Sequence, residues 1–303
     1  MKQPKYPIYI PSKGRVSNPL TIRLLLKDDI PFRVAVEPQE AAAYETLVGK
    51  DRLFVLPKDN QGLIYSRNCI RADAVTQGAE RHWQWDDDIR KMYRLYRGRR
   101  IQCSPSVAIA ALEDFTDRYE NIGISSFNSC FFIPARRGII EFAPPPFSLN
   151  FRCYTCFLMQ NSLPCRWRFK YNEDTDMTLQ VLALGLCTVM FNAFLIDPMD
   201  TNANATGQGK NSKNMGGQAT VYEGDGRLQM ARQLERVWPG VVTTRRRFGR
   251  PQHRVNWKRF DQPLIRRKDI DWDSLERGGV DEMGMQLKQL KAIKSQALKD
   301  MLE

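Results

Sequence analysis

The sequence predicts an α/β fold in which a mostly parallel, mixed sheet is followed by a basic C-terminal extension and a terminal helix. Three observations lead to this prediction. Short apolar segments typical of strands alternate with helical segments from the N-terminus onward, and this order favours parallel strands joined by right-handed crossovers. Further apolar strands follow the first acidic cluster. The net charge of +12 gathers near the C-terminus, which distinguishes that region from the rest.

The N-terminal unit begins with a strand that breaks into the loop Ser12-Lys13-Gly14-Arg15. Apolar alternation and helix-start signals then predict one element after another along the chain. We expect strands at 7–11, 32–36, 52–57, 82–85, 122–125, 129–133, 151–159 and 186–196, and helices at 20–26, 40–48, 64–78, 105–119, 177–185, 228–238 and 280–303.

The composition indicates a globular protein with three regions. Hydrophobic residues make up 42% of the 303 residues, and no apolar run approaches the roughly 20 residues that would span a bilayer. Seven cysteines, an odd number, favour a reducing compartment, and the N-terminus has no signal-peptide pattern, so we expect a cytoplasmic protein. We expect a catalytic domain at 1–200, a flexible loop and basic segment at 201–268, and a helical tail at 269–303.

Three consecutive carboxylates, Asp86, Asp87 and Asp88, follow the aromatic strand that contains Trp83 and Trp85. Adjacent aspartates repel one another, so stability alone does not explain them. A divalent cation does, because Mg²⁺ and Mn²⁺ take one or two carboxylates and complete their shell with phosphates and waters. A solvated acidic turn is the alternative for this motif taken alone.

A second acidic cluster, Glu173, Asp174 and Asp176, precedes an apolar helix. Acids at a helix N-terminus complement its dipole, which accounts for one or two of them. Three acids in four residues, in a chain that already holds Asp-Asp-Asp, indicate a catalytic carboxylate that faces the same cleft.

The C-terminal extension predicts a polyanionic partner. Between Arg227 and Lys268 there are thirteen Lys or Arg and two acids, a local net charge of +11. Cations interspersed with aromatic rings fit phosphate contacts and base stacking, so DNA is the expected partner. The candidate DNA-binding residues are Arg245, Arg246, Arg247, Arg250, Arg254, Trp257, Lys258 and Arg259, with Phe248 among them. A smaller basic stretch at 91–100 is interleaved with Tyr93 and Tyr96.

The order of these motifs resembles the nucleotide-sugar-dependent glycosyltransferases of the GT-A fold. Strings at 9–15, 36–40, 85–89, 172–176 and 238–242 are similar to the TET-associated glycosyltransferases, over roughly residues 7–260. That family, found largely in bacteriophages, is linked to glycosylation of oxidised DNA bases such as 5-hydroxymethylcytosine. The resemblance implies a nucleotide-sugar donor, with a UDP-sugar expected, a DNA acceptor, and the cytoplasm of an infected bacterium as the location.

The resemblance also implies roles for single residues. Pro11, Ser12, Arg15 and Glu37 would hold the nucleotide base and ribose, and Arg67, Asn68 and Asp87 would complete the donor site. Asp86 and Asp88 would hold Mn²⁺ or Mg²⁺, with His253 as a candidate third ligand. Glu173 or Asp174 would deprotonate the acceptor, and Asp176 completes that cluster.

Two other functional classes fit parts of the sequence. A nucleotide-sugar glycosyltransferase with a protein or glycan acceptor keeps the chemistry and leaves the basic segment incidental. A metal-dependent DNA-binding protein or nuclease keeps the metal and the basic segment but needs no sugar donor. A Cys153-x-x-Cys156 pair with Cys165 nearby suggests zinc only weakly, because no further ligands are spaced to complete a site.

Overall fold

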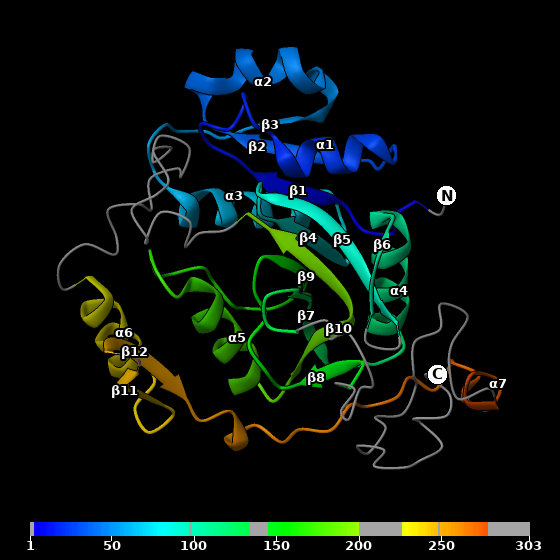
Figure 1. The fold of residues 1–303 in the computed structure, drawn as a ribbon, viewed down its shortest axis with the longest axis vertical. Coiled ribbons are helices and arrows are strands. Elements are labelled where there is room, and N and C mark those ends of the chain that lie inside the picture. Colours follow the sequence, from blue (N-terminus) through cyan, green and yellow to red (C-terminus); the bar gives the residue numbers. More distant parts are fainter. Residues whose placement is uncertain (1–2, 97–98, 134–144, 200–225, 248, 278–303) are drawn as a thin grey trace.

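A computed structural model describes residues 3–96, 99–133, 145–199, 226–247 and 249–277 (Figure 1). The expectations for the loop at 201–218, for Phe248 and for the helix at 280–303 lie outside the described residues.

One large mixed sheet forms the centre of the protein, in the strand order β3-β2-β1-β4-β9-β7-β10-β5-β6, with β8 paired to β10. The four strands from β3 to β4 are parallel, as the alternating sequence predicted, and antiparallel β9 separates β4 from β7. The strands are β1 (Ile8–Pro11), β2 (Arg33–Val36), β3 (Leu53–Val55), β4 (Arg81–Trp85), β5 (Ile89–Tyr96), β6 (Arg99–Cys103), β7 (Ile122–Ser129), β8 (Phe147–Leu149), β9 (Cys156–Gln160) and β10 (Cys187–Pro198).

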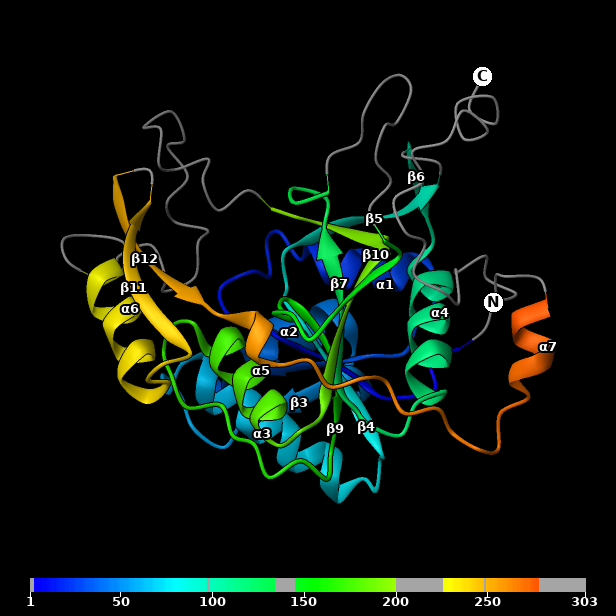
Figure 2. The ribbon, with the colours of Figure 1, turned by 90° about the horizontal axis from the view of Figure 1, so that it is seen from below.

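Helices cover both faces of this sheet, which confirms the predicted α/β class. Ile22 of α1, Tyr44 of α2 and Phe115 of α4 share one apolar core with the sheet, while Ile64 of α3 and Val181 of α5 pack on the other face. Figure 2 shows α4 and α5 on opposite sides of β7 and β10. The helices are α1 (Leu20–Lys27), α2 (Ala41–Val48), α3 (Leu63–Thr76), α4 (Pro105–Asp117) and α5 (Glu173–Ala183), with 3₁₀ turns η1 (Pro38–Glu40) and η2 (Lys50–Arg52).

Strand β4 is buried along its whole length and separates two environments. Trp83 and Trp85 point into the larger core. There Trp83 stacks on Phe127, and Trp85 meets the same ring edge to face. His82 and Gln84 point to the other face because successive side chains of a strand alternate. His82 is fully buried between Asn161 and Gln84, and burial lowers its pKa to about 4, so this histidine is part of the core.

The predicted strands around 129–133 and 151–155 are wrong. β7 ends at Ser129 and the next residues form a turn, while β9 starts only at Cys156. Thr155 adopts a left-handed backbone with φ of 67°, outside the extended region that a regular strand requires. The two predicted strands at 122–125 and 129–133 are therefore one strand and a turn, since the polar Ser125 and Ser126 are buried without interrupting β7.

Two hairpins were not predicted as strands. β5 and β6 form an antiparallel pair in the basic stretch at 91–100, and β11 (Val242–Arg247) pairs with β12 (Arg250–Val255) in the extension. Both are rich in arginine and lack the apolar alternation that marks a strand in sequence.

The extension packs against α5 and then runs along the body. Leu234 of α6 (Gly226–Val237) and Val242 of β11 share an apolar cluster with Leu179 of α5. After η5 (Trp257–Arg259), Arg266 forms an isolated antiparallel bridge with Tyr119 of the body. The ring of Trp272, the first residue of α7 (Trp272–Arg277), then packs on the ring of Tyr119. Within the described residues, no helix has the length and apolar content needed to cross a bilayer.

Candidate active site

The first acidic cluster lies in a tight turn between β4 and β5. Thr21, in the first turn of α1, donates its hydroxyl to the carbonyl of Asp86 at 2.6 Å and accepts the backbone N–H of Ile89 at 2.9 Å. The backbone N–H of Asp86 donates to the carbonyl of Thr155, and that of Met199 donates to the carbonyl of Asp88. Three other segments of the chain therefore fix the backbone that presents the three carboxylates.

The three carboxylates have different partners. Asp86 accepts a hydrogen bond from Arg67 at 2.7 Å, and Asp87 accepts from Ser12 and pairs with Arg15. Asp88 Oδ1 is buried and has no hydrogen-bond partner among the described residues. Burial, reinforced by the charges of Asp86 and Asp87, raises the pKa of Asp88 to about 7.

Asp87 joins the acidic turn to the loop after β1. Ser12 bonds both Asp87 and the hydroxyl of Tyr44 at 2.7 Å, and Tyr44 also accepts the backbone N–H of Arg15. Pro11 is buried at the end of β1, beside Ala35 in β2. These contacts bring the predicted donor-site residues of the first loop together.

Glu37, at the end of β2, belongs to the same corner. Its carboxylate is buried and accepts hydrogen bonds from Lys13 at 2.6 Å and from Gln39 at 2.8 Å. Burial acts to raise its pKa, but Lys13 and the other donors outweigh this, so the pKa is lowered and the side chain is an anion. Lys13 also donates to the side-chain oxygen of Asn60 at 2.9 Å.

Arg67, on α3, is a buried cation beneath the acidic turn. It is 2% exposed and lies between the rings of Phe157 and Trp167, with its guanidinium carbon 5.3 Å and 4.8 Å from their centres. Its two terminal nitrogens reach Asp86 and Gln84. The neighbouring Asn68 exchanges two hydrogen bonds with the backbone of Trp167, so its amide fixes that segment and does not reach the acidic turn.

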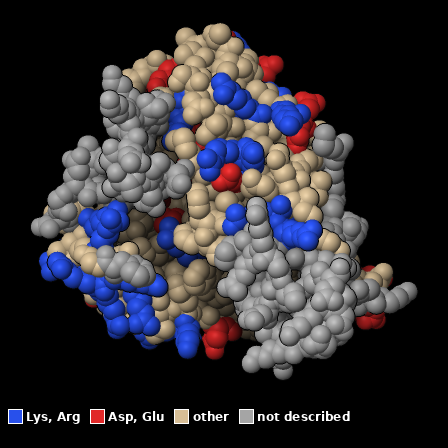
Figure 3. All heavy atoms as spheres, viewed as in Figure 1, with Lys and Arg blue, Asp and Glu red and all other residues tan. Residues whose placement is uncertain are grey.

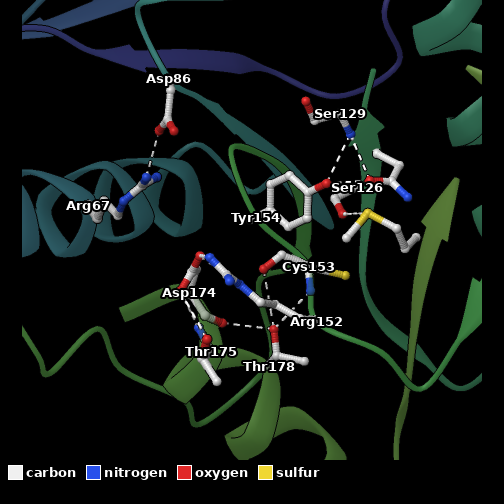
Figure 4. A network of polar contacts seen from close by, with 12 residues as sticks. Arg67, Asp86, Ser126, Ser129, Arg152, Cys153, Tyr154, Asp174, Thr175 and Thr178 are labelled. Atoms are coloured by element: carbon white, nitrogen blue, oxygen red, sulfur yellow. Dashed lines mark hydrogen bonds and ion pairs between the residues drawn. The ribbon is translucent and has the colours of Figure 1, made fainter. Parts of the chain in front are cut away.

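The second acidic cluster faces the first across Arg67 (Figure 4). Burial raises the pKa of Asp86, Arg67 opposes this, and the charge of Asp174 adds to it. Burial and the charge of Asp174 raise the pKa of Glu173 to about 7, and Asp86 also contributes. Residues far apart in the sequence thus form one group of carboxylates around a single buried arginine.

Within this second cluster, Glu173 and Asp174 differ in their partners. Arg152 holds Asp174 through two of its nitrogens, and Asp174 also accepts the backbone N–H of Thr175 at 2.6 Å. The Glu173 carboxylate accepts no hydrogen bond from another side chain in the described part of the protein. Asp174 is therefore fixed in place, while the carboxylate of Glu173 is available to an incoming group.

Asp176 has a structural environment. It is fully buried and receives two hydrogen bonds from Arg168, one from Gln180 and one from the indole of Trp238. Trp238 lies at the end of α6, so Asp176 connects α5 to the extension. All its partners come from the protein, and a catalytic role for this residue gains no support from its position.

His253 lies beside the second acidic cluster. Burial lowers its pKa, the charge of Arg152 lowers it further, and Asp174 opposes both. The described residues contain no group of three or more His, Cys, Asp or Glu side chains arranged to hold a metal ion, so His253 does not gather with Asp86 and Asp88. Cys153, Cys156 and Cys165 are buried free thiols, and the zinc interpretation gains no support.

The acidic turn nevertheless fits a divalent ion that takes few protein ligands. Asp88 offers a buried oxygen without a partner, and Asp86 engages Arg67 through Oδ1 alone. Mg²⁺ and Mn²⁺ need hard oxygen ligands and accept one or two carboxylates beside phosphates and waters. Asp86 and Asp88 are therefore the residues that would hold such an ion.

The basic hairpin β11–β12 stands beside this site. Its register pairs Thr243 with Arg254, Arg245 with Gln252 and Arg247 with Arg250, which places these side chains on one face, and His253 on the other. Figure 3 shows Lys and Arg side chains gathered over α6 and this hairpin. A pocket of about 430 Å³ is lined by Gly240, Val241, Thr243, Arg245, Arg254, Val255, Asn256, Trp257 and Lys258.

The candidate DNA-binding residues are not equally available. Arg245, Arg246, Arg250, Arg254 and Lys258 are exposed. By contrast, Trp257 packs its ring on Phe151, and Arg259 donates to the carbonyl of Gly240 at 2.8 Å.

The comparison with known families decides the classification. The model of the TET-Associated Glycosyltransferase family matches residues 6–207. The chain belongs to this family. It is therefore a glycosyltransferase, and its family implies a nucleotide-sugar donor. The match contains both acidic clusters and the residues predicted for the donor site, whereas the string at 238–242 and the β11–β12 hairpin lie beyond it.

Other comparisons are more limited. No curated protein matches the sequence. A solved structure of mannose-1-phosphate geranyltransferase from Thermus thermophilus is 17% identical to this glycosyltransferase, with a TM-score of 0.30. The similarity covers 63% of this chain and 58% of the other.

Sequence reasoning missed several residues of the site. Tyr44 and Arg152 orient Ser12 and Asp174, and Trp167 covers Arg67. Tyr44 and Arg152 lie outside any acidic or basic cluster, whereas Trp167 lies between Arg166 and Arg168. Arg152 also offered a readable signal, because it is a charged residue in a segment otherwise predicted as a buried strand.

Asp176→Ala should destabilise the protein and leave the chemistry of Glu173 in place. The substitution leaves Arg168 and the indole N–H of Trp238 without their hydrogen-bond acceptor. We expect a loss of about 2–3 kcal/mol, less than the roughly 3–5 kcal/mol of a fully buried pair because Arg168 is 40% exposed. Urea unfolding measures this loss in the free energy of unfolding, with Asp273→Ala, at an exposed acid on α7, as the control variant. Unchanged stability would contradict the assignment.

Proposed function

We propose that this glycosyltransferase transfers a sugar from a nucleotide sugar, most simply a UDP-sugar, to the hydroxymethyl group of a modified base such as 5-hydroxymethylcytosine in DNA. The observation that carries the proposal is the group of carboxylates around buried Arg67, with the basic β11–β12 hairpin beside it through His253. One cluster suits the donor, the other suits the acceptor, and the hairpin suits a polyanion that presents the acceptor.

The donor side would use the corner around the first loop. Glu37 is an anion that can accept the N–H of a nucleobase or a ribose hydroxyl, and Ser12 and Arg15 are oriented by Tyr44 and Asp87. Arg15 Nη1 is buried and has no partner among the described residues, so it remains a donor for a ligand oxygen. Arg67 compensates the negative charge beneath the diphosphate.

The leaving diphosphate needs positive charge near it. A Mn²⁺ or Mg²⁺ ion at Asp86 and Asp88 would act as a Lewis acid when bound. Asp87 keeps the turn in place through Ser12 and Arg15, so the other two carboxylates keep their positions.

The acceptor side would use Glu173. An alcohol needs a carboxylate within hydrogen-bond reach to take its proton, and the pKa near 7 makes Glu173 a stronger base than an ordinary glutamate. Arg152 holds Asp174 in place, so Asp174 contributes charge close to the acceptor. A base in duplex DNA would be flipped out of the stack to reach this position. The reaction would take place in the cytoplasm, that of an infected bacterium if a phage encodes the protein.

The experiment that tests the proposal is a transfer assay read by nucleoside mass spectrometry. Protein, Mn²⁺ or Mg²⁺ and a panel of nucleotide sugars are incubated with DNA that carries cytosine, 5-hydroxymethylcytosine or 5-hydroxymethyluracil. We expect a hexose- or pentose-sized mass gain on one hydroxymethylated base. Asp88→Ala should reduce it at least about a hundredfold without unfolding the protein, because Asp88 Oδ1 has no partner to lose.

Each alternative gives its own result. Hydrolysis of the donor with no mass gain on any DNA would indicate that the acceptor is a protein or a glycan. Plasmid nicking with Mg²⁺ and no nucleotide sugar would favour a nuclease. Full activity of Asp88→Ala, judged against Asp51→Ala on the exposed turn η2, would reject the metal assignment.

The transfer rate should fall as the pH drops below about 7. Glu173 is a base only when deprotonated, and its raised pKa places that change near neutrality, so the rate should fall about tenfold per pH unit below it. Glu173→Gln should remove most of the activity and this pH dependence together. Glu45→Gln, an exposed position on α2, serves as the control. A wild-type profile that stays flat down to pH 5 would exclude Glu173 as the base.

Replacing Arg245 and Arg254 by alanine should weaken DNA binding. Both are exposed and line the pocket at the β11–β12 hairpin. Two lost phosphate contacts should reduce the slope of log affinity against log salt by about 2. Fluorescence anisotropy with labelled duplex at several KCl concentrations measures both quantities. Affinity and slope equal to wild type would show that this face does not contact DNA.

A further inference from the structure

The β5–β6 hairpin carries cations that the donor and acceptor chemistry above does not use. Residues 89–103 contain one lysine, five arginines and no acid. Arg90 pairs with Asp197, and Arg94 packs over the ring of Phe194. Lys91 and Arg99 are exposed and form no ion pair with any residue in the described ranges. A surface that needed only to be solvated would not require such an excess of one sign.

Large apolar side chains are exposed beside these cations. Phe131 and Phe132, in the turn after β7, are 50% and 68% exposed, and Tyr96 and Ile101 of the hairpin are 49% and 51% exposed. Arg100 binds the turn to the hairpin, since it donates to the carbonyls of Cys130 and Ile133. The register places Lys91 and Arg100, with the turn that Arg100 holds, on one face of the β5–β6 ribbon, and Arg99, Tyr96 and Ile101 on its other face, so cations and rings are exposed on both faces of the hairpin.

This surface is continuous with the active site. β5 starts at Ile89, directly after Asp88, so the hairpin extends from the acidic turn itself. On the other side, the ring of Phe132 meets Tyr154 edge to face at 5.8 Å. Arg152 lies over the same tyrosine and holds Asp174. A chain of direct contacts thus runs from the exposed phenylalanine to the acceptor-side carboxylates.

The two basic hairpins project to the same side of the protein. In Figure 2, β5–β6 and β11–β12 stand on either side of the end of β7. Figure 3 shows basic side chains over both regions on that face. An extended polyanion that contacts one hairpin would therefore pass the active site and meet the other.

We infer that the β5–β6 hairpin and the turn at 130–133 form a second DNA-contact surface, which holds the acceptor on the side of the active site opposite the β11–β12 hairpin. This inference rests on the proposed DNA acceptor. Lys91 and Arg99 contact phosphates, and Phe132 stacks on a base that is unpaired next to the modified one. Cations alone would suit any polyanion, but exposed rings among them match a strand whose bases are accessible.

Two variants separate these contributions in the same anisotropy titration. Lys91→Ala with Arg99→Ala should weaken binding and reduce the salt slope by about 2, because phosphate contacts release counterions. Phe132→Ala should weaken binding about fivefold or more and leave the slope unchanged, because stacking involves no counterion. Lys27→Ala with Lys50→Ala, which removes the same charge from α1 and η2, is the matched control. Donor hydrolysis without DNA should be equal in all of them.

The outcomes distinguish this inference from the function on which it rests. If wild type glycosylates DNA while the Lys91/Arg99 variant binds like the Lys27/Lys50 control, the inference is overturned and the proposed function stands. If wild type glycosylates no DNA, both fall. A reduced salt slope for the Lys91/Arg99 variant, with donor hydrolysis intact, supports the second surface.

Discussion

The ion pair between Arg67 and Asp86 is the interaction on which the site depends. Several carboxylates lie close together there, and at low dielectric their mutual repulsion would drive them apart or protonate them. Arg67 is almost fully buried and fixed between two aromatic rings, and the guanidinium group of an arginine is a cation in proteins. It therefore supplies a permanent positive charge at a defined place. Asp88 and Glu173, which lack such a direct partner, are the carboxyls whose pKa rises to about 7.

The parts of the fold predictable from the sequence are those that local pattern determines. The alternating strands and helices up to β4, the start of α4 after Ser104, and the acidic turn at a strand end all follow from periodicity and capping. The site was predictable where its residues cluster in sequence. Its orienting residues were not, because Tyr44 and Arg152 act through contacts with distant segments. The two hairpins were not predicted because their arginine-rich strands lack a regular apolar alternation, although Ile89 and Met92 of β5 enter the core.

Glu173, Asp174 and Asp176 show why a cluster in sequence is not a cluster in function. Successive residues of a helix point about 100° apart, so Glu173 and Asp174 project in different directions, while Asp176 lies one turn further along α5 and meets other partners. Glu173 faces the other carboxylates, Asp174 is held by Arg152, and Asp176 turns inward to Arg168 and Trp238. A sequence motif treats the three as equals, and the helix geometry assigns each a different role.

The attachment of the extension has a consequence for how such proteins diversify. The family match ends at residue 207, yet the extension is fastened to α5 through Trp238 on Asp176 and Val242 on Leu179. The helix that carries Glu173 is thus also the element on which the extension packs. Exchange of this extension between relatives would leave the family-matched body in place, provided that the new extension carries an indole to meet Asp176 and an apolar residue to meet Leu179.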